Sequence, residues 1–161
     1  MIRRQLAAVL WLLPLALLSG CVTLTNKPAA GADTTSSLTV VALADGSSRV
    51  DIATDAAFDF GSAVLRPVFA AQLSQLVKPY SQHPVRVSGY TDNVGAAAYN
   101  LDLSQQRAQA VADVLITQGF NATQLSVSGY GEGNPVASNA DESGRYRNRR
   151  IELLITDNTD D

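Results

Sequence analysis

A four-residue repeat constrains the fold of this chain more than any other feature of its sequence. Val87-Ser88-Gly89-Tyr90 recurs as Val127-Ser128-Gly129-Tyr130, forty residues further on. Each copy closes an apolar strand pattern, and a helical pattern lies between the copies. Strand, helix and strand within this span predict a right-handed crossover that joins two parallel strands. Both Gly-Tyr turns would then leave the sheet at the same edge, unless so short a repeat arose by chance.

The other apolar patterns predict two helices and three further strands. We expect a hairpin of residues 38–43 and 49–54 around Asp45-Gly46, and a last strand at 151–155. The first helix begins near Pro67, and its apolar stripe is Phe69, Leu73, Leu76 and Val77. The second helix ends at Gly119, and its stripe is Leu101, Ala108, Val111, Ala112 and Leu115.

The first twenty residues match a lipoprotein signal peptide that is cleaved. Arg3 and Arg4 precede an apolar run, 6–18, which is shorter than the ~20 residues of a membrane-spanning helix. The run closes on a bacterial lipobox, Leu18-Ser19-Gly20-Cys21, in which Cys21 becomes lipidated. The alternative is an ordinary signal peptide with a chance cysteine. However, Cys21 is the only cysteine of the chain, so it has no intramolecular disulfide partner.

The mature chain divides into a tether and one domain. Residues 21–37 are small and polar without apolar periodicity, which indicates a flexible tether, and residues 38–161 form the domain. Two of the 12 basic residues lie in the signal peptide, so 10 remain against 15 acidic residues. This negative balance argues against nucleic-acid binding. One histidine and one lipidated cysteine provide no zinc cluster, and no metal or cofactor is expected.

A carboxylate and a guanidinium flank one strand-to-helix junction. Asp92 lies in the loop Gly89-Tyr90-Thr91-Asp92-Asn93-Val94-Gly95, and Arg107 lies on the helix that follows. Such a pair can hold a zwitterion, because the carboxylate takes an ammonium and the guanidinium takes a carboxylate. Taken singly, Asp92 also fits an Asx turn, and Arg107 also fits a solvated helix position.

Several motifs occur in the order and at the spacing of one known family. They are Phe58-Asp59-Phe60-Gly61-Ser62, Gly89 to Gly95, Tyr99-Asn100, Leu103-Ser104 with Arg107-Ala108, Gly129-Tyr130-Gly131-Glu132 with Asn134-Pro135, Asn139, Gly144-Arg145, and Asn148-Arg149-Arg150-Ile151-Glu152. Over residues 50–156 the chain resembles the OmpA-like peptidoglycan-binding domain. With its lipobox it is similar to the peptidoglycan-associated lipoproteins of Gram-negative outer membranes. The resemblance implies an α+β two-layer sandwich: a mixed sheet of βαβαββ type with two main helices on one face, preceded here by the hairpin.

The resemblance also implies a binding role for five residues. Asp92 and Arg107 match the aspartate and arginine that hold the amino and carboxylate groups of diaminopimelate in the peptidoglycan stem. Asn100 and Leu101 match positions that line the same groove, although Leu101 also fits the core. Arg149 matches a basic residue near the end of the last strand that faces the groove.

One position departs from the family, and catalysis is not expected. Some members have a polar ligand-facing residue where this chain has Gly61, which offers only its backbone. A catalytic triad needs a histidine beside a nucleophile and an acid. His83 precedes Pro84, at the opposite end of its strand from Asp92, and the sequence contains no Gly-x-Ser-x-Gly elbow.

We therefore expect a non-enzymatic, lipid-anchored protein of the outer membrane whose domain lies in the periplasm. Val22 follows Cys21, where an aspartate would mark retention in the inner membrane by enteric-type sorting. The expected function is the tethering of the outer membrane to peptidoglycan. The alternative is an adaptor between envelope proteins for which wall binding is secondary. An exposed apolar patch on the hairpin of residues 38–54 would support the adaptor.

Overall fold

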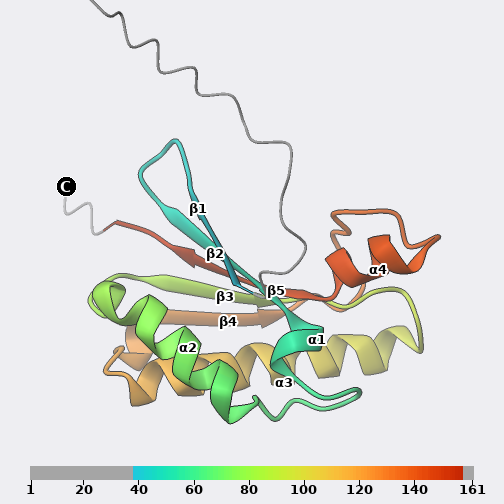
Figure 1. The fold of residues 1–161 in the computed structure, drawn as a ribbon, viewed down its shortest axis with the longest axis horizontal. Helices are drawn as coiled ribbons and strands as arrows, with labels where there is room; N and C mark the ends of the chain where they lie inside the picture. Colours follow the sequence, from blue (N-terminus) through green and yellow to red (C-terminus); the bar gives the residue numbers. More distant parts are fainter. Residues whose placement is uncertain (1–37, 158–161) are drawn as a thin grey trace, which may run out of the picture. The chain divides into compact units, whose positions relative to one another are not determined.

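The fold is a mixed sheet of five strands. The structure, a computed structural model, describes residues 38–157. The strands are β1 (Leu38–Ala42), β2 (Ser48–Ala53), β3 (Val85–Gly89), β4 (Leu125–Gly129) and β5 (Arg150–Ile155). They lie in the order β1-β2-β5-β3-β4 (Figure 1). β3 and β4 are parallel, and every other neighbouring pair is antiparallel. This arrangement confirms the predicted α+β class.

Two long helices cover one face of the sheet. The helices are α1 (Thr54–Ala57), α2 (Pro67–Val77), α3 (Ala97–Thr117) and α4 (Glu142–Asn148), with the single turns η1 (Lys78–Tyr80) and η2 (Ala122–Gln124). Figure 1 shows α2 and α3 on the same side of the sheet. The order β2-α2-β3-α3-β4-β5 is the predicted βαβαββ. Sequence analysis missed α4, whose cap is the Asp141 carboxylate that accepts the Gly144 N–H at 2.7 Å.

The repeat identified in the sequence aligns the two parallel strands in register. Val87 pairs with Val127 and Gly89 with Gly129, so the predicted crossover is confirmed. Both glycines are required because α3 passes directly over them. A Cβ atom added at Gly89 would fall on the carbonyl oxygen of Ser104, and one added at Gly129 would fall on the backbone of Gln105. The repeat therefore arises because one helix contacts two adjacent strands at equivalent positions.

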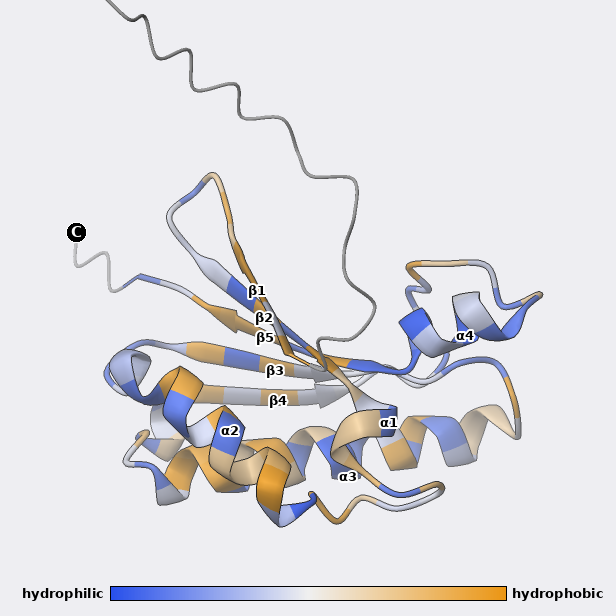
Figure 2. Ribbon diagram, in the orientation of Figure 1, coloured by the Kyte–Doolittle hydropathy of each residue, from blue (hydrophilic) through white to orange (hydrophobic). Residues whose placement is uncertain are grey.

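The core lies between the helices and the sheet. Alternate strand residues point toward the helices, and Figure 2 shows apolar residues recurring along α2, α3 and the strands. The buried core residues of these elements are Val50, Ile52, Val85, Val87, Ile151, Leu153, Ile155, Phe69, Leu73, Val77, Ala108, Val111, Ala112 and Leu115. Both predicted helical stripes are largely confirmed. Leu76 is half-buried at the margin of this core.

Leu101 is an exception, because its side chain is 52% exposed. Its assignment to the core stripe was wrong. α3 has 21 residues and β3 and β4 have five each. A helix of this length spans ~31 Å and strands of that length ~17 Å, so the first turns of α3 project beyond the sheet. No strand of the described part of the chain lies there to cover Leu101.

The signal peptide (1–20), Cys21 and the tether (21–37) lie outside the described residues, as do the last four residues of the chain. Among residues 38–157, no helix combines the length and apolar character that crossing a bilayer requires.

Candidate functional site

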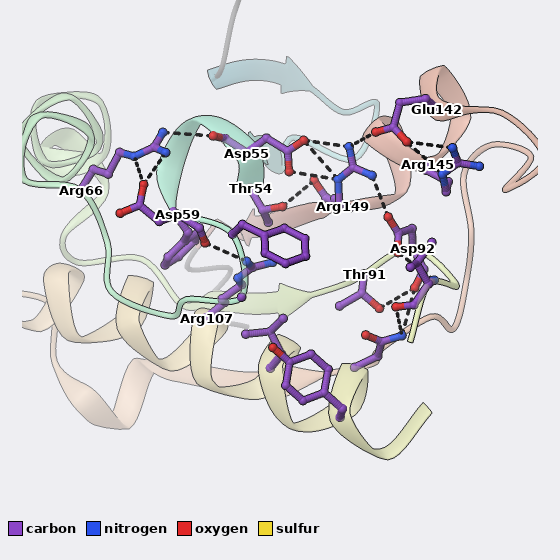
Figure 3. A pocket seen from close by; sticks show the side chains of 17 residues that line it. Thr54, Asp55, Asp59, Arg66, Thr91, Asp92, Arg107, Glu142, Arg145 and Arg149 are labelled. Carbon is purple, nitrogen blue, oxygen red and sulfur yellow. Dashed lines mark hydrogen bonds and ion pairs between the residues drawn. The ribbon is translucent and has the colours of Figure 1, made fainter. Parts of the chain in front are cut away.

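A pocket of about 500 Å³ lies at the edge of the sheet where four strand ends meet. Since β5 is antiparallel to β2 and β3, its first residue lies beside their last residues, and β4 ends alongside β3. The walls come from the segments 54–61, 91–94, 99–107 and 142–149, together with Arg66 (Figure 3). As the repeat predicts, both Gly-Tyr turns leave at this edge. The Thr91 N–H donates to the Gly131 carbonyl at 2.7 Å, and Tyr90 stacks on Tyr130.

Asp92 closes a turn with one carboxylate oxygen and pairs with Arg149 through the other. Its side chain is buried, and its Oδ1 accepts the Val94 N–H at 2.9 Å, which closes the Asx turn. Its Oδ2 accepts a hydrogen bond from Nη1 of Arg149 at 2.7 Å. Asn100 steadies the same loop, because its Nδ2 donates to the carbonyls of Asp92 and Val94 at 3.4 and 3.2 Å. The turn thus presents a carboxylate in a fixed position on the pocket wall.

Arg107 is a buried cation without a carboxylate partner in the described part of the chain. Arg107 as a whole residue is 6% exposed. Nε donates to the Ser62 carbonyl at 2.8 Å, and Nη2 lies 3.5 Å from the Asp59 carbonyl. The guanidinium also lies 5.3 Å from the centre of the Phe58 ring. Burial lowers the pKa of Arg107 below its ordinary value, although an arginine stays charged at neutral pH. The cation therefore retains capacity to bind an anion from the pocket.

Arg149 connects three carboxylates. It forms a two-pronged contact with Asp55, Nε to Oδ1 at 3.0 Å and Nη2 to Oδ2 at 2.8 Å. It also bonds Asp92 at 2.7 Å and Glu142 at 2.6 Å. The hydrogen bonds with Asp55 are the largest of several contributions that raise the pKa of Arg149 well above its ordinary value. Arg149 lies between α4 and β5, directly before the first residue of β5, so its expected place near one end of the last strand is confirmed.

The charges that line the pocket are balanced in number. The acids are Asp55, Asp59, Asp92 and Glu142, and the bases are Arg66, Arg107, Arg145 and Arg149. Apart from Arg107, each base forms an ion pair with one of these acids. A balanced pocket with one cation left over suits a ligand that carries both charges and presents its carboxylate to that cation.

The structure brings together four of the five residues predicted to bind. Asp92, Asn100, Arg107 and Arg149 all line the pocket, and Leu101 does not. Gly61 lines it too, with φ at +65°, a backbone conformation that favours glycine.

Sequence reasoning missed Asp55 and Glu142. Asp55 lies in a four-residue helix, and it meets Arg149 across 94 positions of sequence. No local pattern marks such a pair. Glu142 follows the capping residue Asp141, so recognition of α4 would have placed it at the start of a helix.

Two further observations concern the residues that a catalytic triad or a metal site would use. His83 lies at the far end of β3 from the pocket, where its Nδ1 is 3.3 Å from the Thr156 carbonyl. Among residues 38–157, no group of three histidine, cysteine or acidic side chains is placed to hold a metal ion.

Comparison with known proteins gives a consistent result. The sequence model of the OmpA family matches residues 57–149. The chain is 43% identical over 102 residues to "Probable lipoprotein YiaD" of Escherichia coli K12, an alignment that covers 62% of this chain and 47% of that protein. The chain thus spans about half the length of this relative.

Solved structures with the same fold include two proteins of the bacterial envelope. The cell wall anchor of the T6SS from Pseudomonas aeruginosa matches with a TM-score of 0.66 and 34% identity, over 74% of this chain and 87% of that one. The peptidoglycan-associated lipoprotein from Burkholderia pseudomallei matches with a TM-score of 0.54 and 34% identity, over 62% of this chain and 86% of that one.

Proposed function

The chain belongs to the OmpA family, and from this premise we propose that it binds peptidoglycan without covalent attachment and tethers the outer membrane to the cell wall. The observation that carries the proposal is the buried guanidinium of Arg107, which lines a charge-balanced pocket and has no carboxylate partner among the described residues. Two similar structures are named for the cell wall and for peptidoglycan, which supports this choice of ligand.

Diaminopimelate is the component of the peptide stem that fits these charges. Its free end carries an ammonium and a carboxylate on one carbon. The carboxylate would accept two parallel hydrogen bonds from Arg107, whose planar guanidinium suits that geometry. The ammonium would donate to Asp92, which the Asx turn and Arg149 already hold in place. Both charges would leave water, so a missing partner would weaken binding by on the order of 2–5 kcal/mol.

The anchor in this proposal is the lipid on Cys21. Its support is the lipobox Leu18-Ser19-Gly20-Cys21, together with relatives and neighbours that are themselves named lipoproteins. Two or more acyl chains would hold the protein stably at the membrane. The tether of residues 21–37, at ~3.3–3.6 Å per extended residue, would allow the domain to reach at most ~60 Å from the membrane surface.

Binding to isolated sacculi tests the site. Arg107→Ala and Asp92→Asn should both lose sedimentation with sacculi. Asn at position 92 can still accept the Val94 N–H, so this change removes the charge and keeps the turn. Arg86→Ala is a matched control, because Arg86 is an exposed arginine on β3 that does not line the pocket. Undiminished sedimentation of a folded Arg107→Ala protein would overturn the assignment.

We propose that this site binds without catalysing a reaction. Among residues 38–157, the pocket lining contains no histidine, cysteine or lysine, and its hydroxyl side chains have no histidine base beside them. Incubation of the purified protein with sacculi should leave the muropeptide profile unchanged. A new cleavage product would contradict this.

The alternative function, an envelope protein adaptor, has one observation in its favour. Val40 on the hairpin is 47% exposed, which is unusual for a valine on the core side of a sheet. If the protein binds envelope partners independently of peptidoglycan, the partners recovered by cross-linking in cells should persist in an Asp92→Asn, Arg107→Ala protein that no longer binds sacculi.

A further inference from the structure

The outer strand β1 is an uncapped edge of the sheet. Its sequence is Leu-Thr-Val-Val-Ala, without a charge or a proline, and no strand among residues 38–157 pairs with its outer side. Natural sheets usually protect such edges with charges, prolines or bulges. At the opposite edge, an N–H group of β4 is capped, because the Gln105 side chain accepts the Gly129 N–H at 2.6 Å. Among residues 38–157, no side chain caps an outward backbone group of β1 in this way.

The direction of the backbone groups follows from the hairpin. The Leu43 N–H donates to the Ser47 carbonyl at 2.9 Å, so the backbone of Leu43 faces β2. Successive residues of a strand alternate in direction. Thr39 and Val41 therefore bond to β2, while the N–H and C=O groups of Leu38, Val40 and Ala42 point outward from the sheet.

The side chains of β1 are also incompletely covered. Val40 pairs with Val50, and both point to the helical face of the sheet. Val50 is 1% exposed, whereas Val40 is 47% exposed. The α2–α3 layer thus covers β2 and leaves β1 open. A further strand beside β1 would satisfy the outward backbone groups and cover Val40 together.

We propose that this strand is β1 of a second copy of the chain, paired antiparallel about a two-fold axis at Val40. In this register Val40 faces the Val40 of the second copy, and Leu38 faces its Ala42. The outward donors and acceptors then meet in three hydrogen-bonded pairs. Every facing pair is uncharged, so no like charges oppose each other. Because the strand is self-complementary in this way, a second copy fits it without any requirement for another protein.

The proposed contact between the two β1 strands is small, so its detection requires a method that captures weak association. Five residues per strand bury less than the ~1,000 Å² expected of a stable interface, so the pairing should be reversible. Cross-linking of the full chain in cells suits a weak contact. Two differently tagged copies would be co-expressed, with a photo-reactive amino acid at position 40 in one of them. Val68, which is 73% exposed on α2, is the matched control position.

A cross-linked product that contains both tags should form from position 40 and not from position 68. A product with another protein alone, or no product from position 40, would overturn the proposal.

Charge variants at position 40 show whether a lower cross-linking yield comes from lost pairing or from misfolding of the variant. With the cross-linker moved to the exposed Thr39, Val40→Asp in both copies should lower the yield about tenfold, because two carboxylates would meet at the axis. Val40→Lys in both copies should do the same. Val40→Asp in one copy with Val40→Lys in the other should restore the yield, and Val68→Asp should leave it unchanged. A mixed pair that stays as low as each variant alone would contradict pairing at Val40.

Discussion

The two central arginines of the pocket should respond differently when each is replaced by leucine. Arg149 bonds three carboxylates, and Arg107 bonds two backbone carbonyls and an aromatic face. Both side chains are largely buried, and leucine can occupy part of the same volume. The comparison therefore isolates the effect of partnered and unpartnered charge in one pocket.

For Arg107→Leu the losses and gains nearly cancel. The charged hydrogen bond to the Ser62 carbonyl contributes about 1.5–3 kcal/mol, and the contact with Phe58 about 0.5–1 kcal/mol. The long contact with Asp59, at 3.5 Å, adds little. Against this stands the removal of a buried charge that lacks an ion-pair partner, which costs several kcal/mol to desolvate. We expect the free energy of unfolding to change by less than about 1 kcal/mol.

For Arg149→Leu the result should be a clear loss of stability. Asp92 would remain buried without its cation, and Asp55 would lose a two-pronged partner. Breaking a buried pair costs about 3–5 kcal/mol, and the partial exposure of Asp55 reduces that value through solvent screening. We expect a loss of about 2–4 kcal/mol.

Urea denaturation at pH 7 measures both changes, provided that the slope m is the same for all variants. Sacculus binding of the same samples should be lost in Arg107→Leu despite its retained stability. If Arg107→Leu unfolds as readily as Arg149→Leu, then Arg107 is part of the folding framework. The reasoning that its charge is held available for a ligand would be refuted.

Three further predictions concern other parts of the chain. Gly89→Ala and Gly129→Ala should each destabilise the fold by about 1–3 kcal/mol in the same urea assay, because the new methyl group must push α3 off the sheet; wild-type midpoints would contradict the close approach. Burial raises the pKa of Asp51, so the folded state holds this proton more tightly than the unfolded state. The Asp51 contribution to stability should therefore fall as pH rises above the ordinary value of 3.8, and Asp51→Asn should remove that fall; identical pH profiles for the two proteins would count against it. Cys21→Ser should move the protein from the membrane fraction to the soluble fraction of lysed cells, and unchanged fractionation would exclude a lipid on Cys21 as the anchor.

The sheet and its long helices could be predicted because their signals are local. Alternating apolar residues mark β2 and β5, and helical spacing marks α2 and α3. The crossover was predictable for a more specific reason. Gly89 and Gly129 are both needed where α3 touches the sheet, and this shared requirement leaves a visible repeat in the sequence.

The site was predictable in part. The family motif identified Asp92, Asn100 and Arg107, but the partners of Arg149 were missed. Asp55 and Asp92 meet Arg149 across 94 and 57 positions of sequence, and periodicity carries no information at such separations. Leu101 was misplaced for a related reason, since helical spacing does not show where the sheet beneath the helix ends.

The most direct measurement of the central claim is competition for sacculus binding by two small molecules that differ in one group. Both compounds are used with one α-amine acetylated and the carboxylate on the same carbon amidated, as in a peptide, so that lysine offers no free α-carbon with both charges. In this form diaminopimelate is lysine with a carboxylate added at the carbon that bears the side-chain amine. If Arg107 receives that carboxylate and Asp92 the adjacent ammonium, the blocked diaminopimelate should displace the wild-type protein from sacculi, and the blocked lysine at the same concentration should not. Equal displacement by both compounds, or displacement by neither, would contradict the account.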